Sequence, residues 1–309
     1  MYDFKRIVVG LELDAECKAV TAGSQKAAQQ AIWVAKANGG SIHFLHSTYN
    51  DEYHDAVIAD QPVVHEGLSE SGKAALEGIV AETRNSGIEA ELDIARDRVW
   101  LEITRMALGD RADLVIVGKR NEPADDGRRL GNVATKLLRK CPAPVWVVKP
   151  EHDLVHRLVL AATDLSPVGG LAVRCAGYVA ARHDCDLHVV HAWQMPFALQ
   201  MESSRMPEGD FEEAVEGIRK ECVDKIKESL ADYQGEKEAT IHTSKGSPAQ
   251  MIREAVTHLD PDLLVMGTIS RAGLAGVLLG STAERLLDRV DCSILTVKPD
   301  DFVSPVTLE

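Results

Sequence analysis

Residues 261–282 read PDLLVMGTISRAGLAGVLLGST, and this stretch decides the fold. Its first part is a short apolar run that ends at Gly267, which is typical of a buried strand in a parallel sheet. A glycine-spaced frame, G-x2-S-x9-G-S, then places Ser270, Gly280 and Ser281 after that strand. A loop of this kind predicts a ligand site where the strand ends.

The same frame occurs 149 residues earlier, at Gly118, Asn121, Gly131 and Asn132. Asparagines stand there in place of the two serines of the later copy. One spacing used twice predicts a duplicated domain. The altered positions predict that the two copies no longer do the same thing.

Three further segment pairs repeat at nearly the same offset: IHFLHS (42–47) with LHVVHA (187–192), ADLVIVG (112–118) with PDLLVMG (261–267), and PVWVVKP (144–150) with SILTVKP (293–299). A chain of 309 residues has the length of two domains of roughly 150 residues each. We therefore expect one domain over residues 1–150 and a second over residues 151–309.

Short runs rich in Val, Ile and Leu alternate with longer amphipathic segments, which is the pattern of an α/β protein. The runs lie at 7–11, 42–45, 88–94, 114–117 and 145–148, and again at 158–162, 187–190, 239–242, 263–266 and 294–297. Apolar stripes at helical spacing over 211–230 and 251–259 predict helices that cover a sheet. We expect two tandem open five-stranded parallel sheets with helices on both faces.

Acidic residues outnumber basic ones by 48 to 34, giving a formal net charge of −14. This balance argues against a surface that coats the phosphates of a nucleic acid, although a local ring of N–H groups can still bind a small nucleotide. The six cysteines are scattered, and the sequence shows no signal peptide and no apolar stretch long enough to span a membrane. The expected location is the cytoplasm.

The candidate site combines the frame with Asp164, which ends the first strand of the second half. Ligands of open parallel sheets bind beyond the carboxyl ends of the strands. There, glycines let a ligand approach the backbone, and Ser281 and Thr282 add hydroxyl donors at the start of a helix. An acidic side chain at Asp164 suits ribose hydroxyls or a metal ion.

Simpler structural roles remain open for these residues. Gly280 could end a turn and Ser281 could cap the helix, while either Asp164 or Ser166 could cap the helix that follows the first strand. The spacing matches neither a Walker A loop nor the G-x-G-x-x-G of a Rossmann turn, which disfavours a kinase or a dinucleotide enzyme.

Together, the blocks GTISRAGLAGVLLGST, TDLS and HVVHAW resemble the universal stress protein family over both halves of the chain. Nucleotide-binding members of that family carry G-x2-G-x9-G-(S/T) after the fourth strand and an acidic residue after the first. Two fused copies and the tail VKPDDFVSPVTLE are similar to the tandem, E-type members. The resemblance implies the adenine nucleotide alpha hydrolase-like fold, ATP held by the loops, and a role in stress resistance.

By position, the resemblance implies that Asp164 contacts the ribose or a magnesium ion and that the Ala192 backbone meets the adenine. The residues implied to hold the phosphates are Gly267, Ser270, Gly280, Ser281 and Thr282. Ser270 departs from the family glycine, and it costs roughly 1–2 kcal/mol of strain if the position needs a positive φ.

The first half departs further from the family pattern. Asn121 and Asn132 replace a glycine and a hydroxyl residue, and Glu12 or Asp14 must serve as the acidic residue. We expect the first half to be a degenerate copy that supports the second half.

Family members pair through their last strands. The apolar strands at 145–148 and 294–297 are therefore expected to pair within this chain as an internal pseudo-dimer, and whether two chains form a homodimer stays open.

No catalytic residues can be assembled from the sequence, so slow ATP hydrolysis is the weakest alternative. The main alternative is a scaffold without nucleotide that binds an apolar ligand, a protein or a metal such as zinc. The H-x-x-H pairs His43/His46 and His188/His191 place their rings on opposite faces of a strand. Each would need a loop residue such as His54 or His65 to complete a zinc site.

Overall fold

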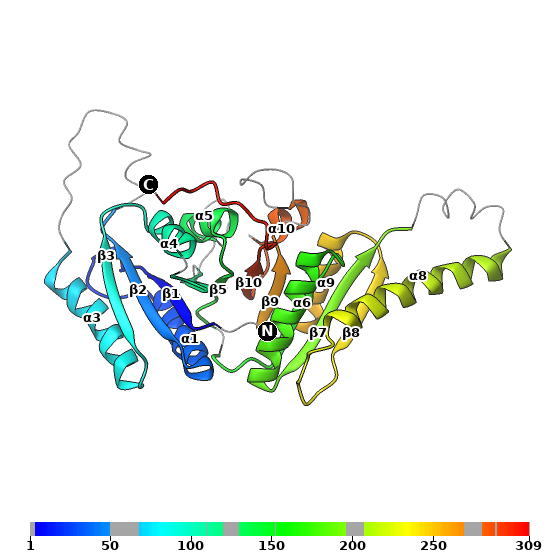
Figure 1. Ribbon diagram of the computed structural model, residues 1–309, viewed down its shortest axis with the longest axis horizontal. Helices are drawn as coiled ribbons and strands as arrows, with labels where there is room; N and C mark the ends of the chain where they lie inside the picture. The colour runs from blue at the N-terminus through cyan, green and yellow to red at the C-terminus, as the bar shows by residue number, and fades with distance from the viewer. Residues whose placement is uncertain are drawn as a thin grey trace.

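The computed structural model describes residues 4–49, 68–109, 111–119, 130–151, 153–195, 207–268, 280–287 and 289–308. Within these ranges the protein is built around one continuous sheet whose two faces are covered by helices (Figure 1). The predicted boundary at 150/151 falls in the connection between the fifth and sixth strands.

The first half contributes strands β1 (Arg6–Leu11), β2 (Ser41–Ser47), β3 (Ala90–Ala95), β4 (Leu114–Gly118) and β5 (Val145–Val148). Its helices are α1 (Ala22–Asn38), α3 (Glu70–Asn85), α4 (Val99–Leu108) and α5 (Asn132–Lys140). Each predicted apolar run of this half lies on one of these strands.

The second half contributes β6 (Leu158–Ala162), β7 (Asp186–Trp193), β8 (Thr240–Lys245), β9 (Leu263–Gly267) and β10 (Ser293–Val297). Its helices are α6 (Pro167–His183), α8 (Glu208–Ser229), α9 (Pro248–Leu259) and α10 (Ser281–Leu286). The two halves therefore repeat the same order of strands and helices.

The strands lie in the order β3-β2-β1-β4-β5-β10-β9-β6-β7-β8 as a ten-stranded sheet. Every neighbouring pair is parallel except β5 and β10, which run antiparallel with Ile294 opposite Val147 and Leu295 opposite Trp146. Two five-stranded parallel sheets thus join edge to edge in the middle of the chain. The predicted internal pseudo-dimer is confirmed.

Two apolar cores lie on the two faces of this sheet, and each core runs through both halves. One contains buried residues of α1, α3, α6 and α8, and the other contains those of α4, α5, α9 and α10. Burial on both faces explains why the central strands read as continuous apolar runs rather than as alternating patterns.

Buried lysines and the C-terminal tail reinforce the seam between the halves. The Lys119 ammonium donates to the carbonyls of Val290 (2.7 Å) and Cys292 (3.1 Å) across the seam. Lys298 donates in the opposite direction, to the carbonyl of Leu138. The tail after β10 crosses onto the first half, where the Ser304 hydroxyl donates to the Lys140 carbonyl at 2.8 Å (Figure 1).

A stack of rings fills the seam between α1 and α6. Trp33 of α1 stacks on His183 of α6 with centroids 3.7 Å apart, and His156 stacks on the same imidazole at 4.3 Å. Nδ1 of His183 accepts a hydrogen bond from the His156 backbone N–H at 3.2 Å. Burial, with the charge of His156, lowers the pKa of His183 from 6.5 to about 3, while Asp262 opposes the shift.

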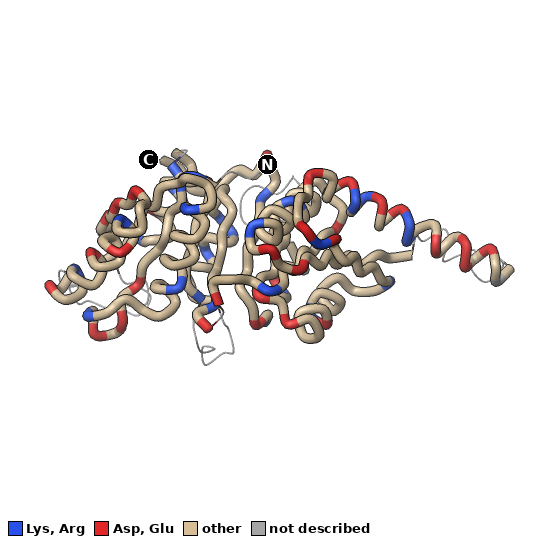
Figure 2. Tube along the Cα trace, turned by 90° about the horizontal axis from the view of Figure 1, so that it is seen from below, with Lys and Arg blue, Asp and Glu red and all other residues tan. Residues whose placement is uncertain are grey.

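Helix α8 differs from its predicted sheet-covering role. Its apolar stripe is helical as expected, but only Cys222 and Ile226 are buried among its described residues. The N-terminal part of the helix extends beyond the sheet (Figures 1 and 2). Ion pairs at helical spacing, Arg219 with Glu216 and Lys225 with Glu221, lie along it.

Acidic and basic residues are interspersed along the chain in the view of Figure 2. No helix in the described ranges has the length and apolar character needed to cross a membrane.

The ring stack predicts acid sensitivity of the folded protein. Below pH 6.5 the unfolded chain protonates His183 while the folded chain does not. Stability is therefore fully present above that pH and falls as the pH drops toward 3, by up to about 1.4 kcal/mol per pH unit. His183→Asn keeps an acceptor for the His156 N–H but cannot titrate, so its loss of unfolding free energy between pH 7.5 and pH 5 should be smaller. Urea unfolding at both pH values measures this difference, and equal losses in the two proteins would contradict it.

Candidate functional site

The predicted site residues gather at the carboxyl edge of the second half of the sheet. Strand β6 lies between β9 and β7, with Ala162 opposite both Met266 and Val190. The strand order reverses between β6 and β9. The next strands along the chain, β7 and β8, lie on one side of β6, and the chain then crosses back to place β9 on the other side. Open α/β sheets bind their ligands in the crevice at such a switch point.

Asp164 follows β6 at this switch point, and its side chain is exposed. Its Oδ1 accepts hydrogen bonds from the backbone N–H of Ser166 (3.0 Å) and from the Ser166 hydroxyl. Oδ2 accepts no hydrogen bond from the residues that the structure describes. The carboxylate is thus fixed through one of its two oxygens.

The helix cap at this position is Ser166, not Asp164. The Ser166 hydroxyl oxygen accepts from the Gly169 N–H at 3.2 Å and begins α6. Leu165, between the two, has φ 62°, a left-handed conformation that non-glycine residues rarely adopt. Strained residues of this kind concentrate at functional sites.

Ala192 lies near the end of β7 and is half-buried. Its neighbour His191 directs Nδ1 to the Thr163 carbonyl at 2.9 Å, which ties the end of β7 to the end of β6. His46 makes the same contact with the Leu11 carbonyl, at 3.0 Å, in the first half. The second histidine of each H-x-x-H pair is therefore a strand-end residue.

Gly267 and Gly280 bracket the glycine loop. A Cβ on Gly267 would lie 3.2 Å from the methyl groups of Val168, so this glycine lets α6 pack against the end of β9. The N–H of Gly280 donates to the Thr268 carbonyl at 2.6 Å, which returns the chain to the strand end. Ser270 lies outside the described residues.

Gly280, not Ser281, is the N-cap of α10, and no side chain caps this helix. Ser281 is the first helical residue and is exposed, and Thr282 is half-buried. The serine hydroxyl is therefore not used as a cap. Since α10 has 6 residues, its dipole is weak, and polar groups of the loop must supply most of any attraction for an anion.

Lys298 contacts the residue that follows β9, and the sequence analysis missed this contact. Its ammonium donates to the Thr268 hydroxyl at 2.8 Å as well as to the Leu138 carbonyl of the first half. Burial lowers the pKa of Lys298 to about 7. The repeated V-K-P motif could have drawn attention to this lysine. The equivalent lysine of the first half, Lys149, instead pairs with Asp291 at 3.1 Å.

The corresponding edge of the first half is closed by backbone. A Cβ on Gly118 would lie 2.4 Å from the carbonyl carbon of Gly23, at the start of α1. Lys119, which occupies the position of Thr268, turns into the seam. Asn121 lies outside the described residues, while Gly131 is the N-cap of α5 and Asn132 is its first residue.

The two acidic candidates of the first half have different surroundings. Glu12 is exposed, and its N–H donates to the Ser24 hydroxyl at 2.8 Å. Asp14 accepts from the Lys18 N–H at 2.8 Å, and this backbone hydrogen bond is the main cause of a lowered pKa of its carboxyl. Asp14 is thus held within its own loop.

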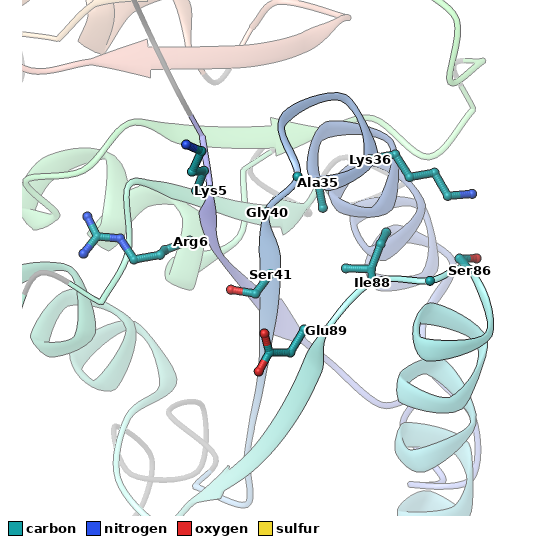
Figure 3. Close-up of a pocket in the computed structure, with 11 residues that line it drawn as sticks. Lys5, Arg6, Ala35, Lys36, Gly40, Ser41, Ser86, Ile88 and Glu89 are labelled. Atoms are coloured by element: carbon teal, nitrogen blue, oxygen red, sulfur yellow. The ribbon is translucent and has the colours of Figure 1, made fainter.

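Two hollows in the described residues lie at the opposite, amino edge of the first half. The larger is about 510 Å³ and is lined by residues such as Lys5, Lys36, Ser41 and Glu89 (Figure 3). The Lys5 and Lys36 side chains point away from each other rather than converging. This arrangement does not form an anion site, and it lies far from Asp164.

Metal ligands do not form a cluster among the described residues. No group of three or more His, Cys, Asp or Glu side chains in these ranges could hold a metal ion. The loop residues His54 and His65 lie outside the described residues. All six cysteines are free thiols, and Cys17 is the exposed one.

Comparison with known proteins places both halves in one family. A sequence model described as "Universal stress protein family" matches residues 3–149 and 156–298. Universal stress protein E of Escherichia coli K12 is 23% identical over 92% of this chain and 93% of its own length. A crystal structure of a Pseudomonas aeruginosa protein described as functionally unknown has a TM-score of 0.67 at 23% identity, covering 96% and 94% of the two chains.

A structure from Arabidopsis thaliana, described as a universal stress protein family protein with AMP bound, is 17% identical. It covers 47% of this chain and 91% of its own, with a TM-score of 0.34.

Substitution by alanine should affect the free energy of unfolding differently at the two frame glycines, Gly118 and Gly267. Gly118→Ala places a methyl group against the Gly23 backbone, which cannot move without shifting α1, so we expect a loss of about 1–3 kcal/mol in unfolding free energy. Gly267→Ala meets only Val168 methyl groups and should cost less. Chemical denaturation of both variants measures the difference, and an equal or reversed order would contradict the packing described here.

Substitution of Gly169, in the first turn of α6, tests the position of the Asp164 carboxylate. A Cβ on Gly169 would lie 2.6 Å from Asp164 Oδ1 and from the Thr163 hydroxyl, so Gly169→Ala should displace the carboxylate. Gly170→Ala is the matched control on the same helical turn, because its nearest contact is the Ser229 hydroxyl at 3.3 Å. We expect Gly169→Ala to lower the unfolding free energy by about 1 kcal/mol through the lost hydrogen bonds, and Gly170→Ala to leave it unchanged or raised. Equal unfolding free energies of the two variants would contradict this prediction, because displacement of the carboxylate would then cost no stability.

Proposed function

The chain belongs to the universal stress protein family, and we propose that its second half binds ATP, with magnesium, at the carboxyl edge of β9, β6 and β7. Asp164 is the residue that carries the proposal. Its carboxylate stands at the switch point, held through Oδ1, with Oδ2 directed to no described partner.

The proposed contacts follow the order of the strands. Asp164 Oδ2 accepts from the ribose hydroxyls or binds the magnesium ion. The backbone near Ala192, two strands from Gly267, meets the adenine edge. The phosphates lie over the residues from Gly267 through Ser270 to Gly280, Ser281 and Thr282, where backbone N–H groups and hydroxyls are the donors.

The second half is favoured over the first by two differences at equivalent positions. Where the first half has Lys119 turned into the seam, the second has the smaller Thr268. A side chain at Gly118 would meet the backbone of Gly23, whereas a side chain at Gly267 would meet only the methyl groups of Val168. We therefore propose that the first half supports the site without binding nucleotide itself.

The biological role that we propose is a contribution to stress resistance in the cytoplasm, with the bound state recognised by partner proteins. Free, mostly buried thiols fit a reducing compartment. The activity that we propose is binding rather than turnover, because the sequence assembles no set of catalytic residues.

Titration with ATP and magnesium tests the proposed site. Asp164→Ala removes the carboxylate, and Gly280→Val places a branched side chain whose Cβ lies 3.1 Å from the Thr268 carbonyl. Both changes should weaken binding at least tenfold, as measured by calorimetry or by thermal shift. A ligand present at 100 times its Kd should add about 2.7 kcal/mol of stability to the unaltered protein.

The control is Asp14→Ala, which changes one of the two acidic candidates of the first half and should leave the affinity unchanged. Equal affinity of all four proteins would rule out the assigned pocket. Absence of any ATP-dependent shift in the unaltered protein would favour a scaffold without nucleotide.

A further inference from the structure

Two histidines from different strands meet at the outer edge of the second half. His188 lies on β7 and His242 on β8, the last strand of the sheet. Their register is diagonal, with Thr240 opposite His188 and Val190 opposite His242. Nε2 of His242 lies 3.0 Å from Nδ1 of His188, and the ring centroids are 5.0 Å apart.

We propose that His188 and His242 form a binding site for a divalent transition-metal ion of the zinc and copper class. Imidazole nitrogens bind such ions at about 2.0–2.1 Å, so two nitrogens on one ion at 90–109° lie about 2.8–3.4 Å apart. The observed separation of 3.0 Å falls in this range, although in the metal-free protein a hydrogen bond joins the two nitrogens. An ion would replace this hydrogen bond once the donating ring carries its hydrogen on its other nitrogen, which requires no change of strand position.

The solvent access of the two rings and the number of protein ligands also fit an open metal site. Both histidines are half-buried rather than enclosed, so water can reach the site. Because no third His, Cys, Asp or Glu completes a cluster among the described residues, water molecules must fill the remaining positions. The structure thus assigns an open, two-histidine site rather than a closed structural zinc site.

The equivalent corner of the first half cannot form the same site. His43 places Nε2 2.9 Å from Asp93 and Nδ1 3.7 Å from Glu91. Its two partners are therefore on different ring nitrogens, which point in different directions and cannot share one ion. His43 provides an internal control of the same residue type at the same strand position.

The metal site is also separate from the proposed nucleotide site. His188 precedes Ala192 by four residues of β7, which is about 13 Å along an extended strand. Binding of the metal can therefore be measured in the absence of nucleotide, and failure of one proposal leaves the other intact.

Calorimetric titration of the untagged full chain with Zn²⁺ and with Cu²⁺ at pH 7.5, after removal of metals with a chelator, tests the proposal. We expect one ion per chain, and at least a tenfold loss of affinity in both His188→Ala and His242→Ala. His43→Ala, Cys17→Ser and Asp164→Ala should retain the affinity of the unaltered protein. For Cu²⁺, the electron paramagnetic resonance spectrum should show coupling to two imidazole nitrogens.

Hydrogen exchange provides a second measurement that does not depend on affinity alone. A bound ion bridges β7 to the edge strand β8, so Zn²⁺ should slow exchange of the β8 amides in the unaltered protein but not in His242→Gln. Absence of binding at pH 7.5 would overturn the proposal. So would histidine-to-alanine variants that bind the ion as tightly as the unaltered protein does. Equal protection of β8 in His242→Gln would overturn it as well.

Discussion

The antiparallel pairing of β5 with β10 is the interaction on which the rest of the molecule depends. Both strands are buried along their whole length, and Trp146, opposite Leu295, is fully buried at the centre. Either half alone would expose an apolar edge with unpaired backbone groups, which invites uncontrolled association. Pairing the two edges removes both at once and makes the two apolar cores continuous across the chain.

The seam also explains why two copies of one fold could diverge. Lys119 and Lys298 are both buried there, and a buried ammonium is tolerated only when hydrogen bonds replace its lost water. The Lys119 ammonium donates such hydrogen bonds to the carbonyls of Val290 and Cys292 in the second half. Lys298 divides its hydrogen bonds between Leu138 of the first half and Thr268, so the residue that follows β9 is linked to the first half. At this one position the two copies thus differ in residue type and in hydrogen-bond partners.

Much of this architecture could be predicted from the sequence, because buried parallel strands appear as uninterrupted apolar runs and duplicated segments give the order of the halves. The internal pairing was expected from the family resemblance, because family members pair through their last strands, and both strands are mostly apolar. The periodicity of α8 identified an apolar face but not what covers it, and so its extension beyond the sheet was missed. The sequence also could not distinguish Gly118 from Gly267, because the difference lies in Gly23 and Val168, which face them from another helix.

Contacts between distant segments account for what the sequence did not reveal at the site. The H-x-x-H spacing directs attention along one strand, whereas His188 actually meets His242, which is 54 residues away on the next strand. Ser166 and Asp164 were both reasonable caps for α6, and only the hydrogen bond from Gly169 decides between them. The link from Lys298 to Thr268 likewise depends on the pairing of β10 with β9, which brings two strand ends together.

The short connection from β5 to β6 gives the seam a property that a dimer of separate subunits lacks. A pairing between separate chains weakens on dilution, whereas a tethered pairing is an intramolecular event with a fixed effective concentration. The stoichiometry of the two halves is locked at one to one. The two halves are therefore always made in equal number, and the assembled sheet persists even when the protein is scarce.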